Sequence, residues 1–221
     1  MQRPDAIFFD LDGTIVDSRW PYAHSLNSAL ERSGLPTYPP EALHKYLGPP
    51  IHDTLADLAV PADLVEQIIV DYRTIYTSLG SQGSTVFDGM RELLTGLHGR
   101  LPLLVATSKA AVLAQPLLKD LELDWCFEQI VGPGATITNE PKSVTVGRAL
   151  GLMDGRLTRD DDGAPRVVMV GDRLYDVVGA GAHKIPTVGV LWGVGAAEEL
   201  RSAGAAALIE HPSELPGLLS L

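Results

Sequence analysis

The chain has 221 residues, of which 45% are hydrophobic and 20% are charged, and its formal net charge is −11. These fractions are ordinary for a folded protein, and the length allows one large domain or a core with a small insertion. The acidic balance argues against polyanionic partners, namely nucleic acids and anionic membrane surfaces.

The first predicted element is a buried strand over residues 6–9, Ala-Ile-Phe-Phe, which runs directly into Asp10, Asp12 and Gly13. Side chains alternate along a strand, so the two carboxylates point the same way if the extended backbone persists to residue 12. Glycine then permits a sharp turn. Such a pair is costly unless a divalent cation neutralises it or the two acids share a proton. It indicates a magnesium-type metal site, a nucleophile beside an acid, or both; the alternative is an ordinary Asp-Gly surface turn.

Residues 17–86 have the pattern of a helical block. Apolar residues at helical spacing, interrupted by glycine and proline, predict helices over 20–30, 40–47, 51–58 and 61–79, and no strand. A helical block placed directly after the first strand indicates a separate subdomain. We therefore expect a small subdomain over 17–86 and a core made of 1–16 and 87–221.

Helices and strands alternate in the remainder of the chain, which implies a parallel sheet covered on both faces. The predicted strands are 101–107, 129–131, 166–171, 187–191 and 207–209, and the predicted helices are 89–97, 110–121, 142–150, 173–182 and 196–203. The fold class is therefore α/β, with a Rossmann-like, three-layer core and an inserted helical subdomain.

Thr107 ends the second core strand and is followed by Ser108 and Lys109. A hydroxyl at a strand end, next to the free N–H groups of a starting helix, is suited to holding a phosphate. The alternative for Thr107 is a simple helix cap. Lys142 starts a later helix, where its charge opposes the helix dipole, so an anionic partner would explain it. A solvated lysine is the alternative.

Asp172 follows the strand predicted over 166–171, and Asp176 lies four residues further on. This spacing places both carboxylates on one side of a helical turn. The alternative is an aspartate cap together with a surface aspartate.

The stretch Phe9-Asp10-Leu11-Asp12-Gly13-Thr14-Ile15-Val16-Asp17-Ser18 resembles the opening motif of the haloacid dehalogenase superfamily in its phosphatase branch. Thr107, Lys142 and Asp172 match the three later motifs in order. Residues 106–109, 170–173 and 187–193 are most similar to the phosphoglycolate phosphatase group, and residues 47–50 and 171–173 to relatives called 5′-nucleotidases.

The resemblance implies Mg²⁺-dependent hydrolysis of a phosphate ester through an aspartyl phosphate. Asp10 would be the nucleophile and Asp12 the acid and later the base, while Thr107 and Lys142 bind the phosphoryl group. The metal would be held by Asp10, the Asp12 backbone carbonyl and Asp172. Asp176 either binds the metal directly or orients a ligand or Lys142.

The helical block resembles the cap that the superfamily places after its first strand, and a cap usually selects small substrates. The residues expected to contact the substrate are Ser108, Lys109, Gly48 and His52. His24 and Asn27 are further candidates on the first cap helix, with a solvated helix face as the alternative.

We expect a cytoplasmic monomer or homodimer that acts on a small phosphorylated metabolite. One cysteine, which excludes an internal disulfide, and a start without a signal-peptide pattern favour that location. The preferred hypothesis is a phosphatase similar to phosphoglycolate phosphatase. The alternatives are a 5′-nucleotidase or inorganic pyrophosphatase, a phosphomutase, a dehalogenase, and a non-catalytic binding protein on the same fold.

Overall fold

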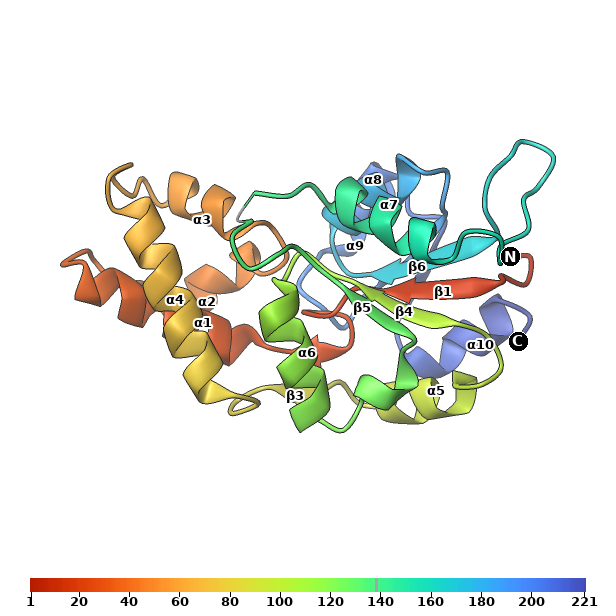
Figure 1. The fold of residues 1–221 in the computed structure, drawn as a ribbon, viewed down its shortest axis with the longest axis horizontal. Coiled ribbons are helices and arrows are strands. Elements are labelled where there is room, and N and C mark those ends of the chain that lie inside the picture. Colours follow the sequence, from red (N-terminus) through yellow and green to blue (C-terminus); the bar gives the residue numbers. More distant parts are fainter. Residues whose placement is uncertain (138) are drawn as a thin grey trace.

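The computed structural model describes residues 1–137 and 139–221 and is built around a six-stranded parallel sheet with the strand order β5-β4-β1-β6-β7-β8 (Figure 1). Its strands are β1 (Ala6–Phe9), β4 (Leu103–Ala106), β5 (Gln129–Val131), β6 (Val167–Gly171), β7 (Thr187–Val190) and β8 (Ala207–Ile209). The chain first builds the sheet on one side of β1 and then crosses to the other side. Ligand sites of open α/β sheets lie at the carboxyl ends of strands where the order reverses in this way, which here is β1.

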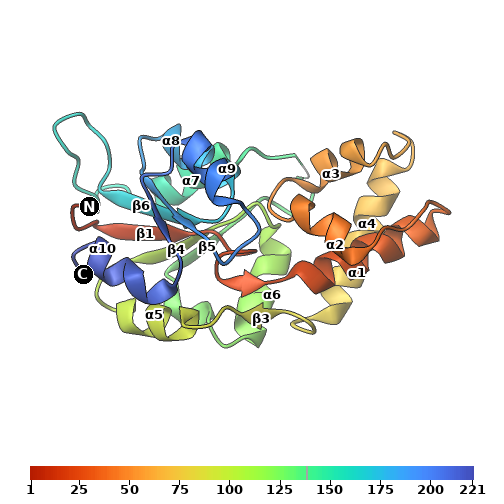
Figure 2. The ribbon, with the colours of Figure 1, turned by 180° about the vertical axis from the view of Figure 1, so that it is seen from behind.

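Helices cover both faces of the sheet, as the alternation predicts. One face carries α7 (Lys142–Leu152), α8 (Leu174–Gly181) and α9 (Ala197–Ala203); the other carries α5 (Met90–Leu97), α6 (Ala111–Asp120) and α10 (Leu215–Leu218). Short 3-10 turns complete the core at η2 (Asp124–Cys126) and η3 (Pro212–Glu214). Both chain termini lie at the end of the sheet away from the cap (Figure 2).

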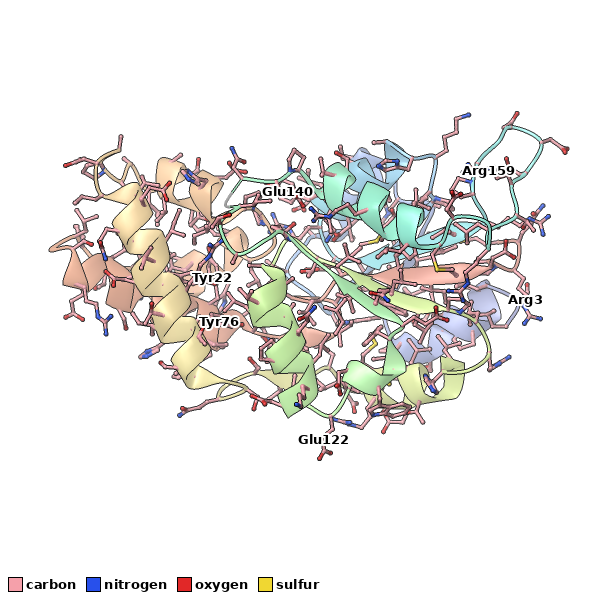
Figure 3. All side chains as sticks on the ribbon, in the orientation of Figure 1. Arg3, Tyr22, Tyr76, Glu122, Glu140 and Arg159 are labelled. Atoms are coloured by element: carbon pink, nitrogen blue, oxygen red, sulfur yellow. The ribbon has the colours of Figure 1, made fainter. Side chains whose placement is uncertain are left out.

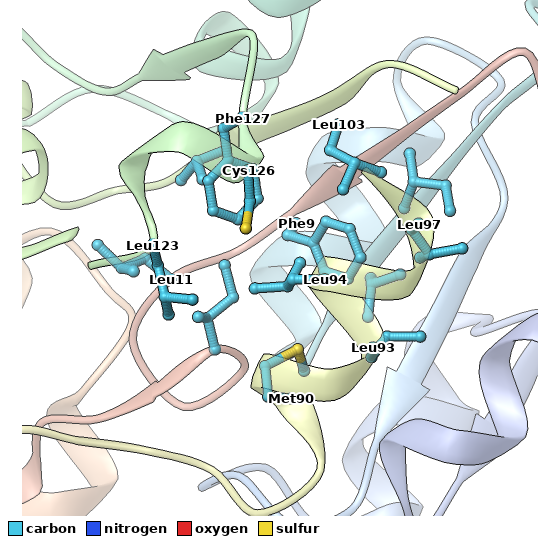
Figure 4. Packing of buried hydrophobic residues seen from close by; sticks show 14 of the residues in the cluster. Phe9, Leu11, Met90, Leu93, Leu94, Leu97, Leu103, Leu123, Cys126 and Phe127 are labelled. Atoms are coloured by element: carbon cyan, nitrogen blue, oxygen red, sulfur yellow. The ribbon is translucent and has the colours of Figure 1, made fainter. Parts of the chain in front are cut away.

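The alternating side chains of β1 supply both halves of the core. Ile7 and Phe9 pack toward α5, where Phe9 lies among Met90, Leu94 and neighbouring apolar side chains (Figure 4). Ala6 and Phe8 pack on the opposite face, toward α7 and α8. Because all four residues of β1 are fully buried, the strand has no solvated side, and the acids that follow it begin in the interior.

The helical block contains α1 (Arg19–Arg32), α2 (Pro40–Leu43), η1 (His44–Tyr46), α3 (Ile51–Asp57) and α4 (Val65–Leu79). It forms its own hydrophobic cluster, in which Leu26, Leu30 and Ile68 are buried between α1 and α4. This block, which we call the cap, lies beyond the carboxyl ends of the core strands (Figures 1 and 2). Within the part of the chain that the structure describes, no helix combines the length and apolarity needed to cross a bilayer.

The prediction of no strand in residues 17–86 is wrong at its two ends. β2 (Val16–Asp17) and β3 (Thr85–Val86) form a two-stranded antiparallel ribbon where the chain enters and leaves the cap. Two residues per strand are too short to produce an alternating pattern, so the signal is missing from the sequence. α6 forms in spite of Pro116, which lies inside it.

Candidate active site

The loop after β1 continues the strand by one residue, because the Asp10 N–H donates to the Val170 carbonyl at 2.8 Å. Gly13 then adopts φ +86°, and a Cβ at this position would lie 2.3 Å from Asp172 Oδ2. Glycine is therefore required both by the turn and by the close approach of Asp172. Beyond the turn, Thr14 Oγ1 donates to Asp172 Oδ1 at 3.2 Å. The ends of β1 and β6 are thus joined directly.

Lys142, the first residue of α7, is buried and pairs with two carboxylates. Its Nζ lies 2.7 Å from Asp10 Oδ1 and 2.7 Å from Asp176 Oδ1. Its side chain packs on Gly179 of α8, where an added Cβ would meet Lys142 Cβ at 2.7 Å. A buried lysine at a helix start is costly without anionic partners, and here the fold supplies two.

The buried groups of this site have strongly shifted pKa values. Burial raises the pKa of Asp10 to about 7, although the charge of Lys142 acts in the opposite direction. Burial, with Asp176 and Asp10, raises the pKa of Asp172 to about 8. Burial alone would lower the pKa of Lys142, but Asp10 and Asp176 raise it above its ordinary value, so the lysine stays cationic. With all three acids ionised, one lysine would leave excess negative charge, a condition that bound protons or a divalent cation relieve.

One group of described acids has the spacing of a metal site: Asp10, Asp172 and Asp176 each offer an oxygen within 4.8 Å of the others. Asp176 is already engaged, since Oδ1 pairs with Lys142 and Oδ2 accepts the Arg173 N–H at 3.1 Å. Asp172 accepts the Val194 N–H at 2.8 Å in addition to Thr14. All three carboxylates therefore have partners within the protein, and Asp10 and Asp176 are the two that contact Lys142.

The Asp12 carboxylate has separate partners. Lys109 Nζ lies 3.1 Å from both of its oxygens, and the Ser18 hydroxyl donates to Oδ1. Lys109 also donates to the Tyr76 hydroxyl at 2.7 Å, which brings a cap residue into the network. Ser18 belongs to the opening motif and Tyr76 to the apolar face of α4, but neither was predicted to take part in this network. Nothing in helical spacing distinguishes a tyrosine that only packs from one whose hydroxyl reaches a lysine.

The end of β4 lies beside this network. Thr107 is buried, and its Oγ1 accepts the Lys109 N–H at 3.1 Å, which caps the turn before α6. Thr107, Ser108 and Lys109 all line one pocket. Asp10 and Asp12 form part of the same wall, so the acids and the hydroxyl face one space.

The cap supplies the opposite wall of the pocket. Tyr22 and Tyr72 contribute from α1 and α4, and Gly48 contributes from the turn before α3. Figure 3 shows Tyr22 and Tyr76 between the cap helices and the core, with Glu140 above them on the loop that leads to α7. The pocket therefore lies at the interface between cap and core.

Three cap residues that were candidates for contacting the substrate do not line the pocket. His52 Nε2 lies 3.5 Å from Glu66 Oε1, and His52 is not among the described residues that line the pocket. His24 stacks on Trp20, with ring centroids 4.9 Å apart. The Asn27 side chain bonds the backbone of Tyr38, with distances of 2.8 and 2.9 Å, which is a structural contact within the cap.

Residues 7–190 match the family model of haloacid dehalogenase-like hydrolases. A 5′-nucleotidase from Pseudomonas aeruginosa is 32% identical over 200 residues, which cover 89% of this chain and 86% of that protein. The tyrosine-protein kinase PtkA from Mycobacterium tuberculosis is 35% identical over 198 residues, 89% of this chain. The match spans 65% of the length of PtkA.

More distant similarities agree with this grouping. A phosphoglycolate phosphatase from Colwellia psychrerythraea is 27% identical over 214 residues, 92% of each chain. The crystal structure of a predicted phosphatase from Clostridium acetobutylicum superposes with a TM-score of 0.89 at 29% identity over 100% of both chains. The fold, the family model and the 5′-nucleotidase relative lead to one conclusion: this chain belongs to the haloacid dehalogenase-like hydrolase family.

Proposed function

We propose that the chain is a metal-dependent phosphatase that hydrolyses a small phosphate monoester through an aspartyl phosphate. The observation that carries this proposal is the placement of Asp10: it is buried at the end of β1, paired with Lys142, and exposed to the same pocket as Asp12 and Thr107. A carboxylate in this setting can act as a nucleophile, while a second acid nearby transfers protons.

In the first step, a carboxylate oxygen of Asp10 forms a bond to phosphorus while the bond from phosphorus to the leaving oxygen breaks. Asp12, in its protonated form, gives its proton to that oxygen. In the second step, Asp12 takes a proton from water as the water oxygen attacks phosphorus. The bond to Asp10 breaks, and orthophosphate leaves. Lys142 and Thr107 donate to the phosphoryl oxygens and stabilise their charge in both steps.

The acidic donors fit a hard divalent cation such as Mg²⁺, because all the candidate ligands are oxygens at buried, mutually repelling carboxylates. Asp10, Asp172 and the backbone carbonyl of Asp12 would hold it. A bound cation would neutralise the phosphate and the attacking carboxylate together. Asp176 then keeps Lys142 directed at Asp10 through the contact at 2.7 Å.

The position of the pocket supports a small substrate, because it lies between the acids of the core and the residues of the cap, and a cap that closes over a site limits what can enter. The similarity to a phosphoglycolate phosphatase supports placing 2-phosphoglycolate first. Inorganic pyrophosphate and nucleoside monophosphates are the alternatives.

Phosphate release from a substrate panel tests this proposal. The panel contains 2-phosphoglycolate, pyrophosphate, nucleoside monophosphates and sugar phosphates, each with Mg²⁺ and with a chelator, and Asp10→Asn is the blank. We expect Mg²⁺-dependent release concentrated on the smallest acid phosphate. Release of no phosphate above the blank from any compound would refute the proposal and favour a mutase or a non-catalytic protein.

The same proposal predicts how Mg²⁺ binding varies with pH. The pKa values of Asp10 and Asp172, about 7 and about 8, lie above the ordinary 3.8, so the folded protein retains protons that the unfolded chain has lost. Their contribution to stability is complete at low pH and disappears as the pH rises toward 8. A cation has to displace these protons. We expect the apparent Mg²⁺ affinity, measured by thermal shift, to rise at least about tenfold from pH 6 to pH 8.

The relative named as a tyrosine-protein kinase is 35% identical, which favours a second candidate. In that reaction a tyrosine hydroxyl would take the place of water and accept the phosphoryl group from Asp10, with Asp12 removing the hydroxyl proton. The same panel can include ATP with a tyrosine-containing peptide. Phosphopeptide formed without orthophosphate would favour the kinase, and orthophosphate alone the phosphatase.

A further inference from the structure

Arg173 bridges the core and the cap. Its Nη1 donates to two backbone carbonyls of the cap, that of Lys45 at 2.9 Å and that of Leu47 at 2.6 Å. Its Nε donates to Glu199 Oε1 of α9 at 2.9 Å. The residue is 8% exposed, so these hydrogen bonds form away from bulk water. A buried guanidinium without hydrogen-bond acceptors would be strongly destabilising.

The two ends of this bridge are parts of the proposed active site. Arg173 directly follows Asp172, and its N–H donates to Asp176, so its backbone is fixed by the acidic cluster. Leu47 directly precedes Gly48, which lines the pocket. Gly48 has φ +111°, and a Cβ there would lie 3.1 Å from Arg173 Cγ. The pocket-lining turn of the cap is therefore packed on the Arg173 side chain as well as bonded to it.

Glu199 makes the bridge specific for arginine. Its Oε1 accepts from Arg173 Nε and from the Leu174 N–H at 2.9 Å, which holds the guanidinium in one orientation. Three acceptors arranged around a planar group with several donors suit arginine, and a lysine at this position has one ammonium to reach them all. The acceptors on the cap are carbonyls, so the contact needs no particular cap side chain.

We propose that Arg173 is a positioning residue that holds the cap turn at residues 45–48 against the metal-ligand turn at residues 172–176 and so sets the wall of the substrate pocket. The contact itself is independent of the reaction. Its effect on catalysis rests on the proposed phosphatase function. Arg173 acts through the position of the Gly48 turn and does not touch the reacting atoms.

Limited trypsin digestion tests the bridge without any need for activity, because trypsin cleaves after Lys45, an exposed residue whose carbonyl is one of the acceptors. In Arg173→Ala we expect cleavage of the Lys45–Tyr46 bond to accelerate about tenfold or more, since two hydrogen bonds from a charged donor are lost. Cleavage after Lys119, on the exposed side of α6, serves as the internal reference for global unfolding.

Arg91→Ala is the matched control. Arg91 also donates to two backbone carbonyls, those of Leu121 and Glu122 at 2.7 and 3.3 Å, but both lie within the core. We expect wild-type cleavage at Lys45 in this variant. Equal acceleration at Lys45 and Lys119 in Arg173→Ala, or none at Lys45, would overturn the proposal.

Steady-state kinetics distinguish a positioning role of Arg173 from a general loss of structure. In Arg173→Ala we expect kcat/KM for the best panel substrate to fall at least about tenfold, with a smaller loss for p-nitrophenyl phosphate, and partial rescue by millimolar guanidinium. Faster cleavage at Lys45 with unchanged kcat/KM would overturn the role in setting the pocket. An inactive wild-type protein would refute the proposed function, while the digestion still decides whether the bridge exists.

Discussion

Replacing Asp10 with asparagine is expected to reduce phosphate release by at least about a thousandfold. The asparagine keeps the shape of the side chain but has no nucleophilic carboxylate, so no aspartyl phosphate forms. The fold should survive the substitution, because burial raises the pKa of Asp10 to about 7. The ionised carboxylate is therefore costly in the metal-free protein, and a neutral asparagine avoids that cost. Lys142 also retains Asp176 as a partner at 2.7 Å.

The measurement is the rate of orthophosphate release with Mg²⁺, together with urea unfolding in a chelator. Asp63→Asn, at an exposed aspartate of the cap, is the matched control and should behave as wild type. Activity close to wild type in Asp10→Asn would exclude the aspartyl-phosphate route.

Replacing Lys142 with methionine is expected to damage stability as well as activity. The substitution keeps a similar volume but leaves Asp10 and Asp176 buried without their cation. Breaking a buried ion pair from one side costs about 3 to 5 kcal/mol of unfolding free energy. The loss should be larger at pH 8 than at pH 6, because protonation of Asp10, whose pKa is about 7, relieves the repulsion at the lower pH.

Urea unfolding at both pH values in a chelator measures this effect, and added Mg²⁺ should restore part of the lost stability. Phosphate release should fall at least about a hundredfold, since Lys142 is expected to bind the phosphoryl group. Lys119→Met, at an exposed site on α6, is the control. An unfolding free energy that does not change in Lys142→Met would mean that the ion pairs contribute nothing to the fold.

Much of the core was predictable because its sequence signals are local. The apolar run at residues 6–9 and the alternation after residue 87 gave a parallel sheet, and the structure confirms that sheet, with β5 and β8 matching their predicted ranges. The family assignment is also confirmed, since the model of haloacid dehalogenase-like hydrolases matches residues 7–190. Each motif is short and adjoins a strand end, so it can be recognised without knowledge of the tertiary structure.

The cap–core contacts were not predictable, because they join residues far apart in the chain. Helical spacing predicts Tyr76 as a packing residue of α4, yet its hydroxyl contacts Lys109. In the sequence Arg173 is notable only as the residue after Asp172, yet its guanidinium donates to the carbonyls of Lys45 and Leu47. Every residue has a backbone carbonyl, so the sequence does not show which carbonyls accept a side-chain hydrogen bond. An arginine that donates to such carbonyls cannot be distinguished in the sequence from a solvated surface arginine. The roles of the individual site residues, and the domain boundaries at residues 16 and 87, stay predictions.

The short ribbon of β2 and β3 has an evolutionary consequence. Both passages between core and cap run through Val16–Asp17 and Thr85–Val86, which are hydrogen-bonded neighbours. An insertion whose two ends lie side by side can be lengthened, shortened or exchanged as a cassette while the sheet and its acids keep their places. On the proposed function, the inserted segment would contribute to selectivity while the sheet carries the chemistry. Grafting the segment between the two ribbon strands from a relative is therefore expected to change substrate preference while leaving the catalytic sheet intact.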